Sequence, residues 1–255
     1  MDAVKGRLKD GDVIVVSEKA LSVAMGNLVD ESRVKPGFFA KFLAYCWVRY
    51  LWGYLLGSAC HLRGEMIRQF RAYPREGAAH KQVALEHVGL LHALKPFSEG
   101  GIDVSNLPFC FACLPLGDPE RIALEILRKV RVVTKKRVGL MIVDTDETFS
   151  LGELHLATRR SQVRGIHSGW RVLAYIFGRM FGLKRRATPL AVVGCDLSVE
   201  EALDVAELAH HARKYGAGRT AWDIAERFEV GLTEVTWEML ESVEHRPIVI
   251  VRRRA

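Results

Sequence analysis

Hydrophobic residues occur along this chain in short continuous runs, separated by polar and glycine-marked segments. The run Val13–Val16 is short and continuous, which is typical of a strand that is buried on both faces, and Val138–Val143 has the pattern of another buried strand. The segments Phe109–Leu114, Ala191–Val193 and Ile248–Val251 are also strand-like. We therefore predict a strand at each of these places, with the first two in the interior of a sheet.

Capping residues mark where longer helices begin. Asp118 is a favourable N-cap, and the proline after it suits the first position of a helix over residues 119–130. Ser198 and Glu201 form a capping box, which predicts a helix that continues to about residue 214.

Other segments give weaker signals. Residues 1–9 have the pattern of a helix end, and a further helix is expected over Glu65–Arg71, before Pro74. The segment His80–Leu94 suits neither the helical nor the strand period, and Gly89 in its middle would allow a β-hairpin.

The aromatic segment Phe38–Cys60 is the most hydrophobic part of the chain, but Lys41 and Arg49 interrupt it. The apolar run that follows Arg49 is much shorter than the roughly 20 residues of a membrane-spanning helix. We expect a buried or interfacial helix here, and a helix at a membrane surface or a dimer contact is the alternative.

Helices and strands are mixed without a regular βαβ repeat, an internal repeat or a low-complexity linker. The pattern favours the α+β class: a mixed sheet with helices, in one domain over residues 1–255, with one lobe or two.

The net charge of +7 favours anionic partners, such as nucleotides, phosphorylated metabolites, nucleic acid or acidic lipid. A plain, solvated, arginine-rich surface would have the same charge. No recognised nucleic-acid-binding motif accompanies it, so a nucleic-acid-binding protein is a weaker hypothesis.

The five cysteines are an odd number in a chain without a secretion signal, which disfavours a disulfide scaffold and fits the reducing cytoplasm. Cys110 and Cys113 have the CxxC spacing, but no second pair accompanies them. Alternation along a strand would place their sulfur atoms on opposite faces, so we interpret both as structural.

Two aspartates are candidates for metal binding. Asp103 follows the pair Gly100–Gly101 in a polar loop, and Asp144 follows a hydrophobic strand and precedes Thr145. Carboxylates with a neighbouring hydroxyl suit Mg²⁺ or Mn²⁺, which would neutralise charge during phosphoryl transfer. Aspartates in turns also serve as caps, and that interpretation stays open.

Several polar residues could contact phosphates. Gly100–Gly101 would let the backbone approach a phosphate, although a plain tight turn has the same sequence. Lys19 follows a buried strand, and His80–Gln82 is a polar cluster; both could also be ordinary surface groups. No Walker A motif or Rossmann glycine fingerprint is present.

Four segments together resemble the coenzyme F-420 gamma-glutamyl ligase family. They are GDVIVVSEKALSVAMGNLVD (11–30), EGGIDVSN (99–106), VGLMIVDTDET (138–148) and PIVIVRR (247–253), and they occur in the family's order. The segments 38–60 and 220–228 have no such counterpart, so we expect a divergent member. The family also has a segment before the first helix, and this chain starts inside that helix, so a shortened or reduced member is expected.

The resemblance implies an enzyme that joins L-glutamate, through its amine, to a carboxylate of a phosphorylated deazaflavin coenzyme. GTP would drive the reaction through an acyl phosphate, and the fold would be an α+β arrangement that forms a homodimer. The substrates would be small molecules, with no nucleic acid and no membrane among the partners. A non-catalytic relative that binds the nucleotide or the coenzyme is the alternative.

The resemblance also implies roles for particular residues. Asp103 and Asp144 would be the catalytic metal ligands, with Thr145 beside them. Nucleotide or substrate phosphates would lie near the residues that complete the candidate site, which are Lys19, Lys81, Ser105, Asn106 and the later arginines Arg159, Arg160 and Arg164.

Overall fold

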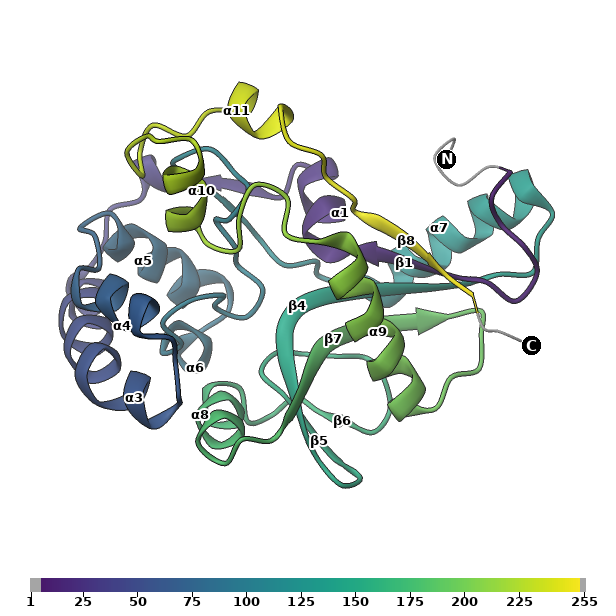
Figure 1. The fold of residues 1–255 in the computed structure, drawn as a ribbon, viewed down its shortest axis with the longest axis horizontal. Helices are drawn as coiled ribbons and strands as arrows, with labels where there is room; N and C mark the ends of the chain where they lie inside the picture. Colours follow the sequence, from purple (N-terminus) through teal and green to yellow (C-terminus); the bar gives the residue numbers. More distant parts are fainter. Residues whose placement is uncertain (1–5, 253–255) are drawn as a thin grey trace.

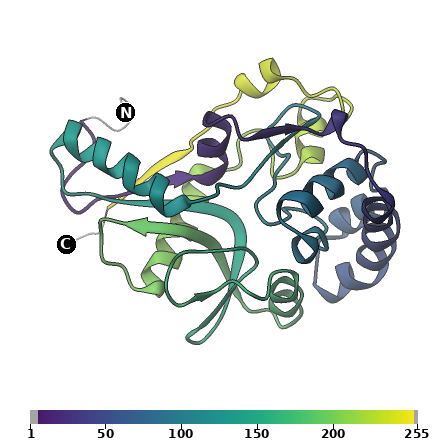
Figure 2. The same ribbon diagram turned by 180° about the vertical axis from the view of Figure 1, so that it is seen from behind.

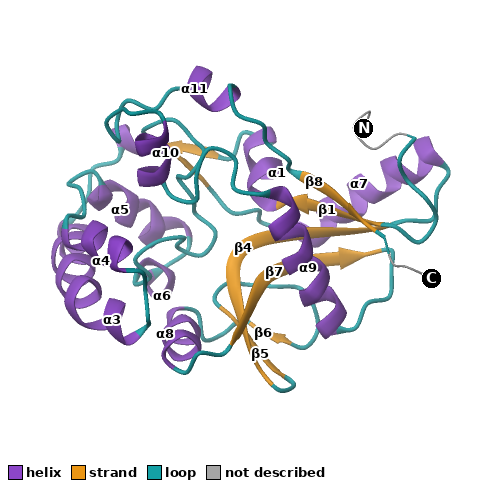
Figure 3. Cartoon of the chain, in the orientation of Figure 1, coloured by secondary structure: helices purple, strands orange, loops and turns teal. Residues whose placement is uncertain are grey.

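The computed structural model describes residues 6–252, and a six-stranded sheet is its centre (Figures 1 and 3). The strands of this sheet are β1 (Val13–Ser17), β4 (Gly139–Leu151), β5 (Leu154–Ala157), β6 (Ile166–His167), β7 (Lys184–Val193) and β8 (Ile248–Val251). They follow the order β6-β5-β4-β1-β8, and β7 pairs with β4. The long strand β4 pairs with β1 in its first half and with β5 in its second half.

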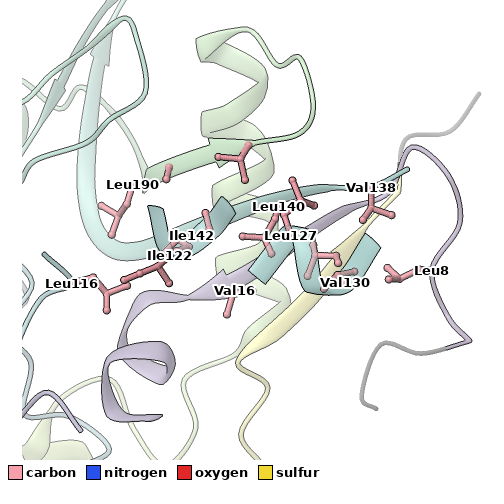
Figure 4. Packing of buried hydrophobic residues seen from close by; sticks show 14 residues of the cluster. Leu8, Val16, Leu116, Ile122, Leu127, Val130, Val138, Leu140, Ile142 and Leu190 are labelled. Carbon is pink, nitrogen blue, oxygen red and sulfur yellow. The ribbon is translucent and has the colours of Figure 1, made fainter. Parts of the chain in front are cut away.

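Helices α7 (Pro119–Thr134) and α9 (Val199–Arg213) cover opposite faces of the sheet, as the two views show (Figures 1 and 2). Leu140 and Ile142 point towards α7 in one hydrophobic cluster (Figure 4). Met141 and Val143, which alternate with them, belong to the cluster that packs on α9. Both faces of the first half of β4 are therefore buried, which explains its continuous hydrophobic run.

A group of helices lies beside the sheet, at the left of Figure 1. Its buried centre includes Trp52 and Phe70, which share a cluster with Tyr175 of α8 (Val172–Met180). Its elements are α2 (Phe38–Phe42), a π-helix (Leu43–Leu56), α3 (Gly57–Ala59), α4 (Gly64–Arg71), α5 (Gly77–His87) and α6 (Leu90–Ala93).

The sheet and these helices are joined by a short region next to β1. It consists of α1 (Glu18–Ala24), a 3₁₀ turn (Glu31–Arg33) and an antiparallel ribbon of β2 (Leu28–Asp30) and β3 (Phe111–Cys113).

Residues 214–247, here called the cap, form a small unit with α10 (Ala221–Arg227) and α11 (Trp237–Glu241). Ile224 and Leu240 are buried in a hydrophobic cluster that belongs to the cap. The side chain of Asn106 links the cap to the polar loop: its amide donates to the carbonyl oxygens of Tyr215 and Gly218 and accepts from the backbone N–H of Ala217.

Most of the predicted elements are confirmed, including the α+β fold class with its mixed sheet. The side chain of Asp118 accepts from the N–H of Arg121, and Ser198 forms the predicted capping box with Glu201. The predicted helix Glu65–Arg71 is present as α4, and the aromatic segment is helical throughout. No helix among residues 6–252 is long and apolar enough to cross a membrane.

Three expectations about local structure need correction. The segment His80–Leu94 is helical, and Gly89 separates α5 from α6, so a hairpin is wrong. The strand expected to end at Val143 continues to Leu151. The helix end expected over residues 1–9 lies partly outside the described residues, and residues 6–9 are a turn and irregular backbone.

Leu140→Ala tests the packing of the sheet on α7. Leu140 is fully buried, and its truncation leaves a cavity, so we expect the free energy of unfolding to fall by about 3 kcal/mol. Val132→Ala on α7, where the side chain is 66% exposed, is the control and should change it by less than about 0.5 kcal/mol. Urea denaturation of both variants measures the difference; equal values would contradict the assignment of this core.

Candidate functional site

A cleft of about 770 Å³ is bounded by the end of β1, the helical group, the polar loop, β4, the end of α9 and the cap. Six of the predicted polar residues line it, from three segments: Lys19, Asp103, Ser105, Asn106, Asp144 and Thr145. Segments far apart in the sequence therefore contribute to one cavity.

Lys19, in the first turn of α1, and the polar loop form one wall. The ammonium of Lys19 lies 2.5 Å from Oδ2 of Asp103 and donates to the hydroxyl of Ser105 over 2.7 Å and to its carbonyl oxygen over 2.5 Å. Oδ1 of Asp103 accepts from the N–H of Ser105 over 2.7 Å. All three donors of this ammonium are thus engaged.

A β-bulge in β4 forms a second wall. The pairing of β4 with β7 shifts between Asp144 and Glu147, so Thr145 and Asp146 have no direct partner on β7. The hydroxyl of Thr188 donates to the carbonyl oxygen of Asp146 and fixes the bulge from inside. Bulges redirect side chains, and here the acidic residues of β4 face the cleft.

Behind this wall, the guanidinium of Arg159 joins two carboxylates. Its Nη2 donates to Oε1 of Glu18 over 2.9 Å, and its Nη1 donates to Oδ2 of Asp144 over 2.6 Å. Burial by itself raises the pKa of Asp144, but the guanidinium holds it below its usual value. For Glu18 burial dominates and raises the pKa to about 7.

The sequence does not indicate the roles of three residues in this centre, which are Glu18, Lys95 and Asp146. Lys95 is buried, and its ammonium donates to Asp146 over 2.9 Å, while the ring of Tyr175 lies 5.5 Å away. Burial raises the pKa of Asp146 to about 6. The only available signal was the position of Asp146 two residues after Asp144, because no local pattern around Lys95 indicates a partner that is 51 residues away.

Lys81 lies apart from the cleft surface. Its side chain is fully buried, and its ammonium contacts the carboxylate of Glu99 and the backbone carbonyls of Ala93 and Lys95. Lys81 is expected beside phosphates, but in the structure its ammonium forms a buried ion pair with Glu99. His80 of the same cluster does line the cleft and bridges two carboxylates, those of Glu31 over 2.6 Å and Glu99 over 3.0 Å.

Comparisons with known proteins identify the family of the chain. The sequence profile described as F420-0:gamma-glutamyl ligase matches residues 1–195. The chain belongs to this ligase family. It is 36% identical to the uncharacterized protein MJ1361 of Methanocaldococcus jannaschii, over 99% of this chain and 89% of that protein. It is 26% identical to the coenzyme F420:L-glutamate ligase of Methanopyrus kandleri, over 56% of this chain and 51% of that enzyme.

The oxygen atoms in the cleft that could coordinate a metal suit a hard cation. Asp103 and Asp144 supply carboxylate oxygens, and Thr145 supplies a hydroxyl. In the described part of the chain, no three His, Cys, Asp or Glu side chains are grouped so that they could hold a metal ion. Two carboxylates and a hydroxyl match the kind of ligands with which proteins commonly bind Mg²⁺, namely one or two carboxylates together with substrate phosphates.

The three arginines expected near phosphates do not line the cleft. Arg159 is buried in the ion pair described above and does not line the cleft. Arg160 and Arg164 are exposed and also lie outside the cleft lining. The cations that do reach this cavity include Lys19 and Lys95, and others come from the end of α9 and from the cap.

His80 gives the protein a pH dependence. Burial alone would lower its pKa, but the carboxylates of Glu31 and Glu99 raise it from 6.5 to about 10. The folded protein therefore keeps a proton that the unfolded chain releases above pH 6.5, so we expect the free energy of unfolding to fall from pH 6.5 towards 10. The slope should be of the order of 1 kcal/mol per pH unit, measured by urea denaturation.

His80→Gln should lower stability at pH 6.5 and flatten this slope, so that variant and parent converge as the pH approaches 10. His211→Gln, where the side chain is 65% exposed, is the control and should keep the parental slope. Parallel curves for parent and His80→Gln would contradict the assignment.

Gly101→Ala tests the approach of the polar loop to Arg159. Gly101 has a φ of +96°, and a Cβ there would overlap the guanidinium of Arg159. Gly152→Ala is a matched control, because Gly152 has a φ of +55° and open space around it. We expect the control to lose about 1 kcal/mol and Gly101→Ala to lose at least about 1 kcal/mol more, measured by chemical denaturation. Equal losses would show that the loop does not require this contact.

Proposed function

We propose that this chain is an amide ligase that joins the amine of L-glutamate to a carboxylate of a phosphorylated deazaflavin coenzyme of the F420-0 type. GTP would drive the reaction, with Mg²⁺ or Mn²⁺ as the metal. The observation that carries the proposal is the gathering of Lys19, Asp103 and Asp144 in one cleft of a member of this ligase family. The name of the Methanopyrus kandleri relative supports the choice of glutamate and coenzyme.

The chemistry explains why such a cleft is needed. A carboxylate is a poor electrophile, so it has to be activated before an amine can attack it. Attack of the acceptor carboxylate on the γ-phosphorus of GTP forms an acyl phosphate and releases GDP. The amine of glutamate then attacks the acyl carbon, and inorganic phosphate leaves. Both steps concentrate negative charge, which cationic groups must neutralise.

Asp103, Asp144 and Thr145 would hold the metal, and phosphate oxygens would complete its coordination. A bound divalent ion would neutralise phosphate charge and align the reacting oxygens. The carboxylate of Asp144 is available for this purpose, because its pKa is held low and it is ionised at neutral pH.

Lys19 and Ser105 would contact phosphates next to Asp103. Because the three donors of the Lys19 ammonium are already engaged, phosphate binding would exchange one of these contacts for a contact with the ligand. Asn106 has a different role in the proposal: it holds the cap over the cleft. The proposal also places the protein in the cytoplasm as a homodimer, as the resemblance and the cysteine content favour.

Asp103→Asn and Asp144→Asn test the site. Calorimetric titration of GTP into the parent protein should give binding that requires Mn²⁺, and both variants should lose it. The rate of GDP release with glutamate and the deazaflavin acceptor should fall at least about 100-fold, because an electrostatic contact to the reacting groups is lost.

Asp196→Asn, on an exposed loop, is the control and should keep both binding and turnover. Unchanged metal affinity in both site variants would exclude the metal assignment. GTP binding without any product in the parent would instead favour a non-catalytic relative that binds the nucleotide or the coenzyme.

A further inference from the structure

The buried cations of this protein differ in whether they have a carboxylate partner. In the part of the chain that the structure describes, four of the five buried lysine and arginine side chains form ion pairs with carboxylates. The fifth, Arg213, has no ion pair or hydrogen bond to another described residue. The four paired cations are Lys81 with Glu99, Lys95 with Asp146, Arg159 with Glu18 and Asp144, and Arg186 with Glu200 and Asp204.

Arg213 is the last residue of α9 and lines the cleft directly before the cap. Arg213 is only 8% exposed, and its Nε has no hydrogen-bond partner within residues 6–252. His210, one turn earlier on α9, also lines the cleft, and its Nδ1 likewise has no partner among the described residues. Arg213 and His210, at one end of α9, thus line the same cavity, and each has a buried nitrogen without a partner among the described residues.

Such an arrangement is costly for a protein without a ligand. An unpaired buried charge loses its hydration, and burial lowers the pKa of Arg213 accordingly. The carbonyl groups at the C-terminus of α9 offset a part of this cost, since a helix C-terminus favours cations. They do not provide the two parallel oxygen acceptors that match a guanidinium best. An oxyanion from a bound ligand would supply the acceptors that the described residues do not provide.

We propose that Arg213, together with His210, forms an anion subsite that binds a carboxylate or phosphate group of a substrate. The guanidinium would donate two parallel hydrogen bonds, and His210 would donate a third from Nδ1. The negative charge of Asp144 acts on both residues, so the subsite lies close to the reaction centre that was proposed above. The existence of the subsite stands on this geometry, and only its role in ligation rests on the proposed function.

The experiment uses the full-length protein and three probes: inorganic phosphate, L-glutamate, and GTP with Mn²⁺. Each probe is titrated by calorimetry into the parent, Arg213→Gln and Lys129→Gln. Lys129 is the control, because it is exposed on α7, lies outside the cleft lining and loses the same charge. Melting temperatures without any probe are measured in parallel.

For Arg213→Gln we expect at least about tenfold weaker binding of one or more probes, because a charge-assisted, bidentate contact is lost. We also expect a higher melting temperature without probe, since the variant no longer buries an unpaired charge. A purely structural arginine would give the opposite shift. Arg213→Lys, which keeps the charge without the planar fork, should bind with intermediate affinity. The Lys129→Gln variant should match the parent in affinity to within about threefold.

The identity of the affected probe distinguishes the source of the anion. An effect on glutamate alone assigns the subsite to the amino-acid substrate, an effect on GTP alone assigns it to the nucleotide, and an effect on phosphate shows affinity for the phosphoryl group itself. Unchanged affinity for all three probes, or a lower melting temperature of Arg213→Gln with parental binding, would overturn the proposal. Failure of the ligase assay with Arg213-dependent phosphate binding would refute the proposed function and leave the subsite intact.

Discussion

The buried guanidinium of Arg159 is the contact on which the candidate site depends. It joins Glu18, at the junction of β1 and α1, to Asp144 at the bulge of β4, so two strands present their polar ends at a fixed separation. Gly101 packs against the same guanidinium, which brings the polar loop with Asp103 to the same place. A charge buried this deeply is stable only with its partners in position, so the loss of one partner would disturb all three segments.

The sheet supports this centre through its two covered faces. Because α7 and α9 bury alternate residues of β4, the strand cannot slip by one residue without exposing a hydrophobic face. The bulge after Asp144 is the point where this pairing is interrupted. A rigid half of the strand thus carries an irregular half whose acidic residues face the cleft, which is a common arrangement at functional sites.

Much of the fold could be predicted because its signals are local. The buried run at Val13–Val16 and the capping residues Asp118 and Ser198 act on their immediate neighbours, and each of these predictions is confirmed. The segment His80–Leu94 gave no clear period because α5 is buried on several sides, so its pattern is not that of an amphipathic helix. The partners of Lys95 and Arg213 depend on the folding of distant segments, and no spacing in the sequence encodes them.

The cap has a consequence for how this protein could change over evolutionary time. It keeps a hydrophobic cluster of its own, lies beyond the residues that the family profile matches, and is hydrogen-bonded to the polar loop by the side chain of Asn106. Substitutions on its inner surface can therefore alter the shape of the cleft entrance with little effect on the sheet or on the acidic centre. Under the proposed function, selectivity for the acceptor and the acidic centre would occupy separable modules, so a lineage could acquire a new acceptor without rebuilding that centre.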